Sequence, residues 1–510
     1  MSSCIVLLAV LSSFSSFALG GPTPNLRGLP IARRPEISTF FHNTQNASDP
    51  EFYPLHHLAG IAPYFISPGV ELNPSPPEGC MIESASYLFR HTDIYANDYD
   101  YEYYLEPFLS KLLNFTARAD FANTSLSLLS DYVPLLNITN ATSQVSEVTP
   151  IGLSDAADLG RMFSSYIPHL VPTDNLTAFK VWTASADRDE DTTRAFISGF
   201  VNDTSLIEVV TVAEGELQAA QTLTPHDSCE TYDATSETNE STTWLNKYAS
   251  PIVQRLNAEI PAFNFTVDDV YAMQQLCGYD TVIGNDTSPF CTTDAFTNED
   301  WLGFEYANDL KYHYSLGYGY PESPSLGLPW VLASVDQLLN ITLSSPLAPS
   351  NTSTTNTTID IASQQKLFLS FTHREEPAFL ATALGIFNNS VGIAGNLTIA
   401  GDINNTMSTE SIDRDRAWKT SEILPFLGNV GLEFLSCPLN GTSYIRVRVN
   451  QAPIPIPDCQ SGPGSTCPTD EFITYIQGRK DQYGDFVKAC ALEDQKNATS
   501  ALGIFIGDVI

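Results

Sequence analysis

Three short apolar runs recur along the chain, and each is followed at once by polar residues and then by a helical pattern. The runs are ASYLF at 85–89, AFKVW at 178–182 and KLFLSF at 366–371. Each has the length of a strand, and strands that are buried on both faces read as continuous apolar segments. The repeated order of strand, polar turn and helix predicts an α/β fold, a three-layer α/β/α sandwich with a mainly parallel central sheet.

Helical patterns follow the second and third runs and also fill much of the region between them. Thr192, Phe196 and Phe200 are spaced four residues apart, and the segment 376–387 is apolar nearly all round, which indicates a buried helix. Amphipathic segments at 103–115 and 250–260 indicate a mainly helical inserted cap. The predicted domains are an α/β domain of residues 51–105, 178–205 and 335–510 and a cap of residues 106–177 and 206–334.

The polar turn after each apolar run carries cationic or imidazole side chains. These are Arg90-His91 after the first run, Arg188 after the second and His373-Arg374 after the third. In parallel sheets, ligands bind in a crevice outside the carboxyl ends of the strands. The pattern therefore predicts that two histidines and three arginines converge on one anion-binding crevice.

The amino-terminal segment predicts export from the cytosol. Residues 4–19 are apolar or small, no charge falls before Arg27, and the run is too short to span a membrane. We interpret residues 1–20 as a signal peptide and residues 21–50 as an extended arm. Eighteen Asn-x-Ser/Thr sequons predict N-linked glycans, and 346–363 is a glycan-prone loop. The protein is expected to be secreted, with the cell wall or a vacuole as alternative destinations.

The cysteines outside the predicted signal peptide are even in number and include no Cys-x-x-Cys pair. This pattern predicts four disulfides rather than zinc ligands, and it leaves 105 pairings open. The eight cysteines are Cys80, Cys229, Cys277, Cys291, Cys437, Cys459, Cys467 and Cys490.

The charge balance narrows the range of partners. A net charge of −35 with only 24 Lys and Arg residues argues against nucleic acid and anionic membranes. The chain contains no Gly-x-Ser-x-Gly elbow, no His-Glu-x-x-His motif and no phosphate-binding Gly-rich loop. The remaining histidines show no metal-ligand spacing, so no metal or cofactor is expected. They are His42, His56, His57, His169 and His313.

The stretch LFRHTDIYA at 88–96 resembles the Arg-His-Gly-x-Arg-x-Pro motif of the histidine acid phosphatases, the fungal acid phosphatase and phytase family. Further segments resemble that family in the same order along the chain, and together the resemblance covers about residues 53–495. These segments are YPLHHLAGIAPYF (53–65), SADRDEDTTRAFISGF (185–200), DLKYHYSLGYGYPESPSLG (309–327), KLFLSFTHREEPAFLATALGIFNN (366–389) and YIRVRVNQAPIPIPDC (444–459).

The resemblance implies hydrolysis of phosphate monoesters at acid pH, with His91 as the nucleophile that forms a phosphohistidine. Arg90 and Arg188 would bind the phosphoryl oxygens, because a guanidinium presents a planar fork of donors, and His373 would supply a further donor. It also implies the disulfide pairs Cys80–Cys437, Cys229–Cys490, Cys277–Cys291 and Cys459–Cys467. The low Lys and Arg content favours a small or weakly charged ester over phytate.

Three positions depart from the family motif. Thr92 stands in place of the Gly, Ile94 in place of the second Arg, and Arg374 in place of the proton-donating Asp. Arginine cannot act as an acid at these pH values. The multiple inositol polyphosphate phosphatases carry the acid two residues after the His, so Glu375 is the expected proton donor and Glu376 the second candidate. Arg374 would then replace the cation missing at position 94. Alternatively, residues 374–376 only form a charged helix start.

Other features are weaker candidates. His226-Asp227 is the only literal His-Asp pair, but no strand precedes it and Cys229 follows, so we expect a disulfide-anchored loop without a catalytic role. Polar and aromatic residues after the first turn are candidates for the pocket mouth. The motif departures leave two alternatives to a phosphatase: acid/base chemistry on another anionic metabolite in the same pocket, or a non-catalytic glycoprotein. The mouth candidates are Tyr95, Asp98, Tyr99, Asp100 and Tyr101.

Overall fold

The computed structural model describes residues 52–506, apart from 139, 141–142, 175–178, 234–237, 285, 293, 342, 344–364, 395–405 and 439–440. The chain divides into two compact units, Met1–Ala32 and Arg33–Ile510, and all the described residues belong to the second. The predicted signal peptide, the arm at 21–50 and the loop at 346–363 lie outside the described residues.

An eight-stranded sheet forms the centre of the second unit, and seven of its strands follow the order β3-β2-β4-β1-β5-β6-β7, with β8 paired to β6. The three predicted apolar runs form β1, β2 and β4, which pair in parallel. The predicted α/β fold is confirmed, and the sheet is mixed because antiparallel pairing begins at β5. The strands are β1 (Met81–Arg90), β2 (Phe179–Ala184), β3 (Ile207–Val212), β4 (Leu367–Thr372), β5 (Asn429–Cys437), β6 (Thr442–Val449), β7 (Ala452–Ile454) and β8 (Cys467–Pro468).

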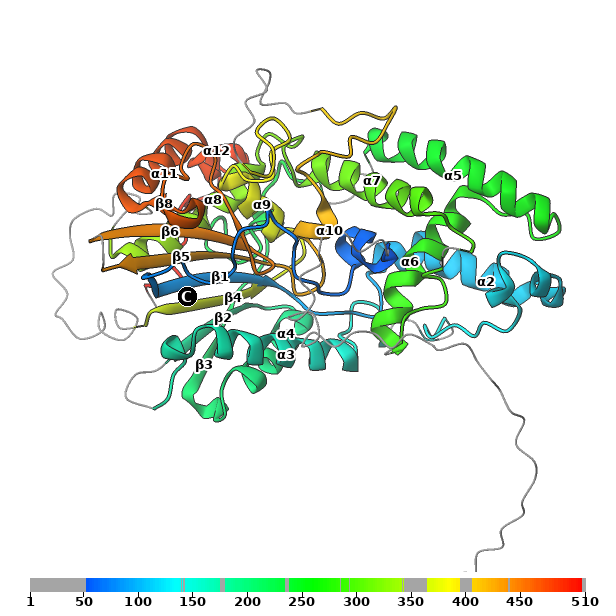
Figure 1. The fold of residues 1–510 in the computed structure, drawn as a ribbon, viewed down its shortest axis with the longest axis horizontal. Coiled ribbons are helices and arrows are strands. Elements are labelled where there is room, and N and C mark those ends of the chain that lie inside the picture. The colour runs from blue at the N-terminus through cyan, green and yellow to red at the C-terminus, as the bar shows by residue number, and fades with distance from the viewer. Residues whose placement is uncertain are drawn as a thin grey trace, which may run out of the picture. The chain divides into compact units, whose positions relative to one another are not determined.

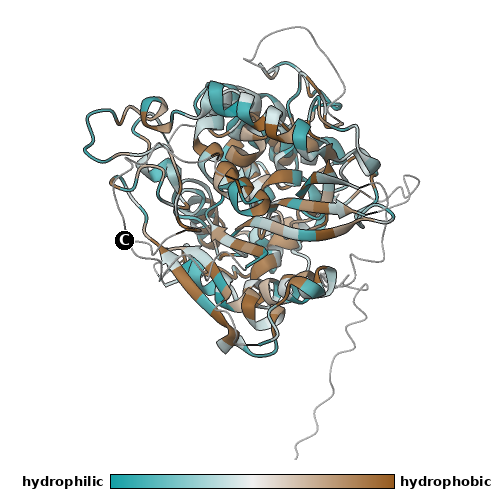
Figure 2. Ribbon diagram, turned by 90° about the vertical axis from the view of Figure 1, so that its left-hand side faces the viewer, coloured by the Kyte–Doolittle hydropathy of each residue, from teal (hydrophilic) through white to brown (hydrophobic). Residues whose placement is uncertain are grey.

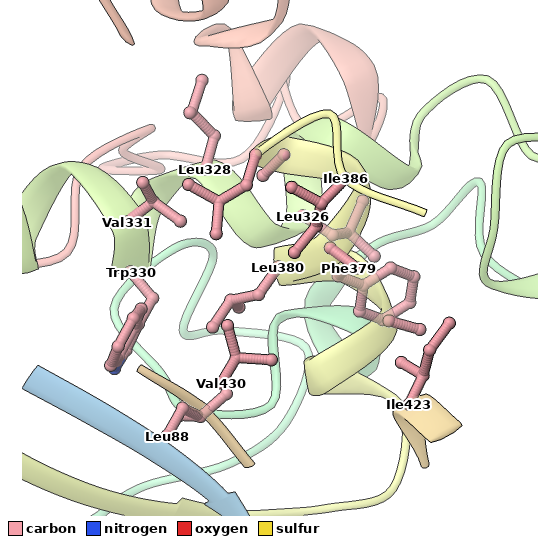
Figure 3. Close-up of a cluster of buried hydrophobic side chains, with 14 of the residues drawn as sticks. Leu88, Leu326, Leu328, Trp330, Val331, Phe379, Leu380, Ile386, Ile423 and Val430 are labelled. Carbon is pink, nitrogen blue, oxygen red and sulfur yellow. The ribbon is translucent and has the colours of Figure 1, made fainter. Parts of the chain in front are cut away.

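Successive strand residues point to opposite sides of the sheet. Because both sides carry apolar residues, helices cover both faces. On one face, Tyr87 and Phe89 of β1 pack with α3 (Pro150–Tyr166) and α4 (Asp187–Phe200). On the other face, Leu88 and Val430 lie beside Leu380 of α9, as Figure 3 shows. The helices on this second face are α8 (Ser323–Leu339), α9 (Glu376–Ala383), α11 (Thr469–Tyr483) and α12 (Phe486–Ala489).

Most of the remaining helices build a separate region with its own core, in which Phe108, Phe263 and Trp301 are buried. Three segments assigned to the cap from sequence belong instead with the sheet, since α3 and α8 pack on its faces and β3 pairs with β2. Figure 1 shows α2, α5, α6 and α7 grouped beyond the sheet. The helices of this region are α1 (Asp98–Asp100), α2 (Glu106–Asn114), α5 (Asn239–Glu259), α6 (Val267–Gly284) and α7 (Asn298–Ser315), whereas the short α10 (Thr420–Ile423) contributes Ile423 to the core on the sheet.

Four disulfides join the chain in the pairing that the family resemblance implied. Within the described parts of the chain, no helix is long and apolar enough to cross a membrane. Figure 2 shows hydrophobic residues along the strands and the helices that cover them. The disulfides are Cys80–Cys437, Cys229–Cys490, Cys277–Cys291 and Cys459–Cys467.

A buried ion cluster lies on the sheet around Glu433 of β5. Arg446 donates to Glu433 Oε2 over 2.8 Å, and Arg448 donates to Oε1 over 3.4 Å. The hydroxyls of Tyr87 and Tyr166 donate to Oε1 over 2.5 and 3.0 Å. Because both oxygens of this carboxylate accept hydrogen bonds, Glu433 is the counter-ion shared by two buried guanidinium groups and joins β1, β5, β6 and α3.

Candidate active site

The turns after β1, β2 and β4 meet at the carboxyl edge of the parallel strands. The backbone N–H of His91 donates to the carbonyl of Thr372 over 2.9 Å, so the first residue after β1 lies beside the end of β4. His373 follows directly, and Arg188 lies in the first turn of α4 after β2. Arg374 stacks over Tyr312 of α7 with its guanidinium 5.4 Å from the ring centre, so this edge faces the helical region.

The imidazole of His91 is oriented by the backbone carbonyl of the next residue. Nδ1 lies 2.8 Å from the carbonyl oxygen of Thr92, and a carbonyl can only accept, so Nδ1 carries the proton and Nε2 has the free lone pair. Burial, followed by the charges of Arg90 and Arg188, lowers the pKa of His91 well below its ordinary value. His91 is therefore neutral at acid pH, as a nucleophile must be.

The lowered pKa of His91 predicts where activity is lost on the acid side. Protonation of His91 removes the nucleophile, so the acid limb of the kcat/KM profile should lie well below pH 6.5, the ordinary pKa of the group. Replacing one of the cations that cause the shift, by Arg188→Gln, should move that limb to higher pH with the same substrate. Parallel pH–rate profiles of the two enzymes test this, and a limb that stays fixed or moves to lower pH would contradict the prediction.

The Arg90 guanidinium is buried and fixed by backbone carbonyls. One terminal nitrogen donates to Gly60 over 2.5 Å and to Leu424 over 2.6 Å, and the guanidinium carbon lies 4.4 Å from the ring centre of Phe426. Its Nε, also buried, has no hydrogen-bond partner within the described part of the chain. Burial and the neighbouring Arg374 lower the pKa of Arg90 to about 10, so it stays charged and can bind an anion.

Arg188 and His373 are two further groups whose charges act on His91. The guanidinium of Arg188 has no hydrogen bond or ion pair to any described residue, which leaves its donors available. His373 Nε2 lies 3.0 Å from Oδ2 of the fully buried Asp189. Burial disfavours the charged imidazole, but Asp189 outweighs that effect and raises the pKa of His373. Sequence reasoning missed Asp189, although its position next to Arg188 at a helix start was a usable signal.

The structure accommodates Thr92 at the position where the family motif has glycine. The Thr92 hydroxyl donates to the carbonyl of Gly152 over 2.8 Å, and its N–H donates to Thr192 Oγ1 over 2.9 Å. A Cβ atom on Gly152 would lie 2.6 Å from the carbonyl oxygen of Asp93. The glycine on α3 therefore leaves room for the turn at Thr92 and Asp93, even though residue 92 is not a glycine. The backbone therefore still turns tightly at His91.

The other two departures change the charges around the site. Ile94 is buried in the core of the helical region, so no cation comes from this position. Arg374 lies close to Gly60, whose carbonyl binds Arg90, and its charge contributes to the lowered pKa of Arg90. Arg374 thus places a guanidinium beside Arg90, and its replacement of the missing cation stays a prediction.

Glu375 and Glu376 pair with different cationic partners. Arg374 donates to Glu375 Oε1 from Nε over 3.1 Å and from a terminal nitrogen over 2.7 Å. Burial favours the neutral acid, but Arg374, His226 and His373 together hold the pKa of Glu375 well below its ordinary value. Glu376 Oε1 lies 2.5 Å from His226 Nδ1; burial raises the pKa of Glu376, and the charge and hydrogen bond of His226 act against that rise. Glu375, the expected proton donor, is therefore ionised even at acid pH.

His226, which sequence reasoning set aside, lies inside this cluster. Its ring centre is 5.8 Å from that of His373. The predicted disulfide-anchored loop is present, since Cys229 pairs with Cys490, but the loop carries His226 to the carboxyl edge of the sheet. Among the predicted mouth residues, Asp100 contributes to the raised pKa of Arg374, whereas Tyr101 packs in the core of the helical region.

Two sets of described side chains have donor types that metal ions bind. One is His226, His373 and Glu375, and the other is Asp189, Glu214 and His373, each with its donor atoms within 4.8 Å of one another. Such sets suit a divalent cation, but Glu375 is paired with Arg374 and Asp189 with His373. We therefore interpret both sets as parts of an ion-pair network.

A mixed α/β fold with an Arg-His turn, a second arginine at a helix start and a second histidine after a parallel strand defines a histidine phosphatase. The family model of the histidine phosphatase superfamily (branch 2) matches residues 82–450. The chain belongs to this superfamily.

Relatives and a solved structure match nearly the whole chain. Acid phosphatase PHO1 of Komagataella pastoris is 28% identical over 471 residues, covering 91% of this chain and 92% of the relative. Phytase PHO112 of Candida albicans is 27% identical over 459 residues, covering 88% and 89%. The crystal structure of the phytase from D. castellii gives a TM-score of 0.73 at 23% identity, covering 91% of this chain and 93% of that one.

Proposed function

We propose that this protein hydrolyses phosphate monoesters at acid pH through a phosphohistidine at His91. The observation that carries the proposal is the neutral His91 imidazole, with Nδ1 fixed by the Thr92 carbonyl and Nε2 free, beside Arg90 and Arg188. The names of the relatives, an acid phosphatase and a phytase, support the same reaction. The motif departures do not remove the nucleophile or the two guanidinium groups nearest to it.

In the first step Nε2 of His91 attacks phosphorus, an N–P bond forms and the ester P–O bond breaks. Arg90 Nε, Arg188 and His373 donate to the phosphoryl oxygens, and fixed donors of this kind stabilise the charge of the transition state. Arg374 lies beside Arg90 but is paired with Glu375. In the second step water attacks phosphorus, the N–P bond breaks and inorganic phosphate leaves.

The substrate is a small or weakly charged ester in this proposal. Tyrosines border the Arg374–Glu375 pair, and Glu375 neutralises the Arg374 charge, so few cations remain for additional phosphates. A polyphosphorylated ring favours a basic cleft. Comparing kcat/KM for p-nitrophenyl phosphate, glycerol phosphate and phytate tests the assignment, and a clear preference for phytate would contradict it.

Arg188→Ala should lower kcat/KM for p-nitrophenyl phosphate by about 10- to 200-fold, because the loss of one hydrogen bond to a charged group costs about 1.5–3 kcal/mol. Arg194→Ala on the same helix is the matched control, since Arg194 is 59% exposed and, among the described residues, pairs only with Glu190 and Asp191. Steady-state assays at acid pH should show the loss in the first variant alone. Equal rates for the two variants would remove Arg188 from the phosphate site.

The protein is also secreted and carries N-linked glycans in this proposal. The four disulfides support an oxidising compartment, and the eighteen sequons support glycosylation.

A further inference from the structure

We propose that His226, held by Glu376, is the general acid that protonates the leaving group in the reaction above. This inference rests on the proposed phosphomonoester hydrolysis and answers the question that Arg374 raises, namely which residue replaces the missing acid. Glu375 is engaged by Arg374 through two donors to one oxygen. The proton must therefore come from another group at the carboxyl edge of the sheet.

The position of His226 suits this role. The short turn Pro225–Ser228 carries the residue, and the Cys229–Cys490 disulfide directly after it anchors the turn. Nδ1 of His226 faces Glu376 Oε1 at 2.5 Å, and Nε2 lies 3.5 Å from Asp227 Oδ1. The second distance is longer than an ordinary N–H···O hydrogen bond, so Nε2 can give its proton to another partner. Donor atoms of His226, His373 and Glu375 lie within 4.8 Å of one another. A nitrogen of His226 thus lies close to the carboxylate that family resemblance places at the leaving group.

The carboxylate of Glu376 stabilises the protonated form of His226. Its side chain is buried at the start of α9, and Oε2 has no hydrogen-bond partner in the described ranges. The adjoining wall is apolar, with Leu88, Trp330, Phe379 and Leu380, which Figure 3 shows packed together. A carboxylate in such surroundings needs a cation beside it. The imidazolium of His226 supplies that cation, as in other carboxylate–histidine pairs that fix the orientation of the ring.

The charges around His226 favour the protonated ring. Burial acts against it, but Glu376, Glu375 and Asp227 together raise the pKa of His226 to about 9. The other titratable groups that face the ring are His373, whose ring is at 5.8 Å, and Tyr232, whose ring is at 5.4 Å. The His226–Glu376 pair therefore holds a proton across the acid pH range in which His91 is neutral.

The proton moves in both steps of the reaction. When the ester P–O bond breaks, the leaving oxygen takes the proton from Nε2 of His226, and the imidazole becomes neutral while Nδ1 still donates to Glu376. When water attacks the phosphohistidine, the neutral Nε2 accepts a proton from that water. The N–P bond then breaks, phosphate is released and His226 is again an imidazolium, so the cycle closes with no net change in the enzyme.

Dependence on the leaving group tests this assignment, because an alkoxide needs a proton and 2,4-dinitrophenolate does not. His226→Gln should lower kcat/KM for glycerol 2-phosphate by about 100-fold or more and for 2,4-dinitrophenyl phosphate by no more than about fivefold. Activity on the second ester also shows that the variant is folded. Glu375→Gln is the comparison variant and should show no such difference between the two esters.

Glu376→Gln provides a second test that keeps the shape of the side chain. Without the carboxylate the pKa of His226 should fall, so the alkaline limb of the kcat/KM profile should move to lower pH. Equal losses on the two esters in His226→Gln, a leaving-group effect in Glu375→Gln instead, or an unchanged alkaline limb in Glu376→Gln would each overturn the assignment. If the wild-type enzyme hydrolyses neither ester, the proposed function falls as well. If one of these overturning results is obtained with a wild-type enzyme that hydrolyses both esters, only the general acid is reassigned.

Discussion

His91→Ala should lower kcat/KM for phosphate monoesters by at least about 10⁴-fold, because the variant has no group to form the covalent intermediate. The cations around the site are unchanged by the substitution, so inorganic phosphate should still bind. The measurement is the rate of p-nitrophenyl phosphate hydrolysis at acid pH, together with phosphate binding by calorimetry. Retained binding separates the loss of the nucleophile from the loss of the site.

His169→Ala is the matched control for this result. His169 Nε2 contacts the carbonyl of Ile82 over 2.7 Å, at the end of β1 opposite to His91. Its replacement should leave kcat/KM within about twofold of wild type, as is usual for substitutions away from a reaction centre. Residual activity of His91→Ala above about a tenth of wild type would exclude His91 as the nucleophile.

Glu433→Ala should lower the free energy of unfolding by about 3–5 kcal/mol, more than the replacement of any other single ion-pair residue discussed above. The substitution leaves Arg446 and Arg448 buried without their counter-ion, and it also removes the acceptor for two tyrosine hydroxyls. Urea denaturation at neutral pH measures the change, since the pKa of Glu433 is lowered and the carboxylate is charged there.

Glu83→Ala is the control for Glu433→Ala. Glu83 lies on the neighbouring strand β1 and pairs with Lys366 over 3.6 Å, but both side chains are partly exposed, at 34% and 61%. An exposed pair contributes at most about 1 kcal/mol. A loss in Glu433→Ala no greater than in Glu83→Ala would show that the buried cluster does not stabilise the fold.

The apolar runs were sufficient to predict the centre of the fold. A strand buried on both faces must be apolar throughout, and β1, β2 and β4 are the central parallel strands that meet this condition. The polar turns at their ends could be placed together because parallel strands share one carboxyl edge. The four disulfides were correct in their pairing through the family resemblance, which supplied what the spacing alone left open.

The helices that do not follow the three apolar runs were harder to assign to the sheet or to the cap. α3 and α8 each directly follow cap segments in the sequence, and their apolar faces do not show which of two cores they enter. The charges at Glu375 posed a similar difficulty, because its protonation depends on Arg374 and on His226 from a distant loop. The His226-Asp227 pair was visible in the sequence, but its surroundings were not, since His226 contacts a residue 150 positions away.

Trapping the covalent intermediate tests the central claim most directly. The enzyme is mixed with a phosphate monoester at acid pH, quenched in alkali, in which phosphohistidine survives, and mapped by peptide mass spectrometry. The account predicts a phosphoryl group on His91 in the wild-type enzyme and none in His91→Ala. A phosphoryl group on another side chain, or substrate turnover without any labelled His91, would contradict it.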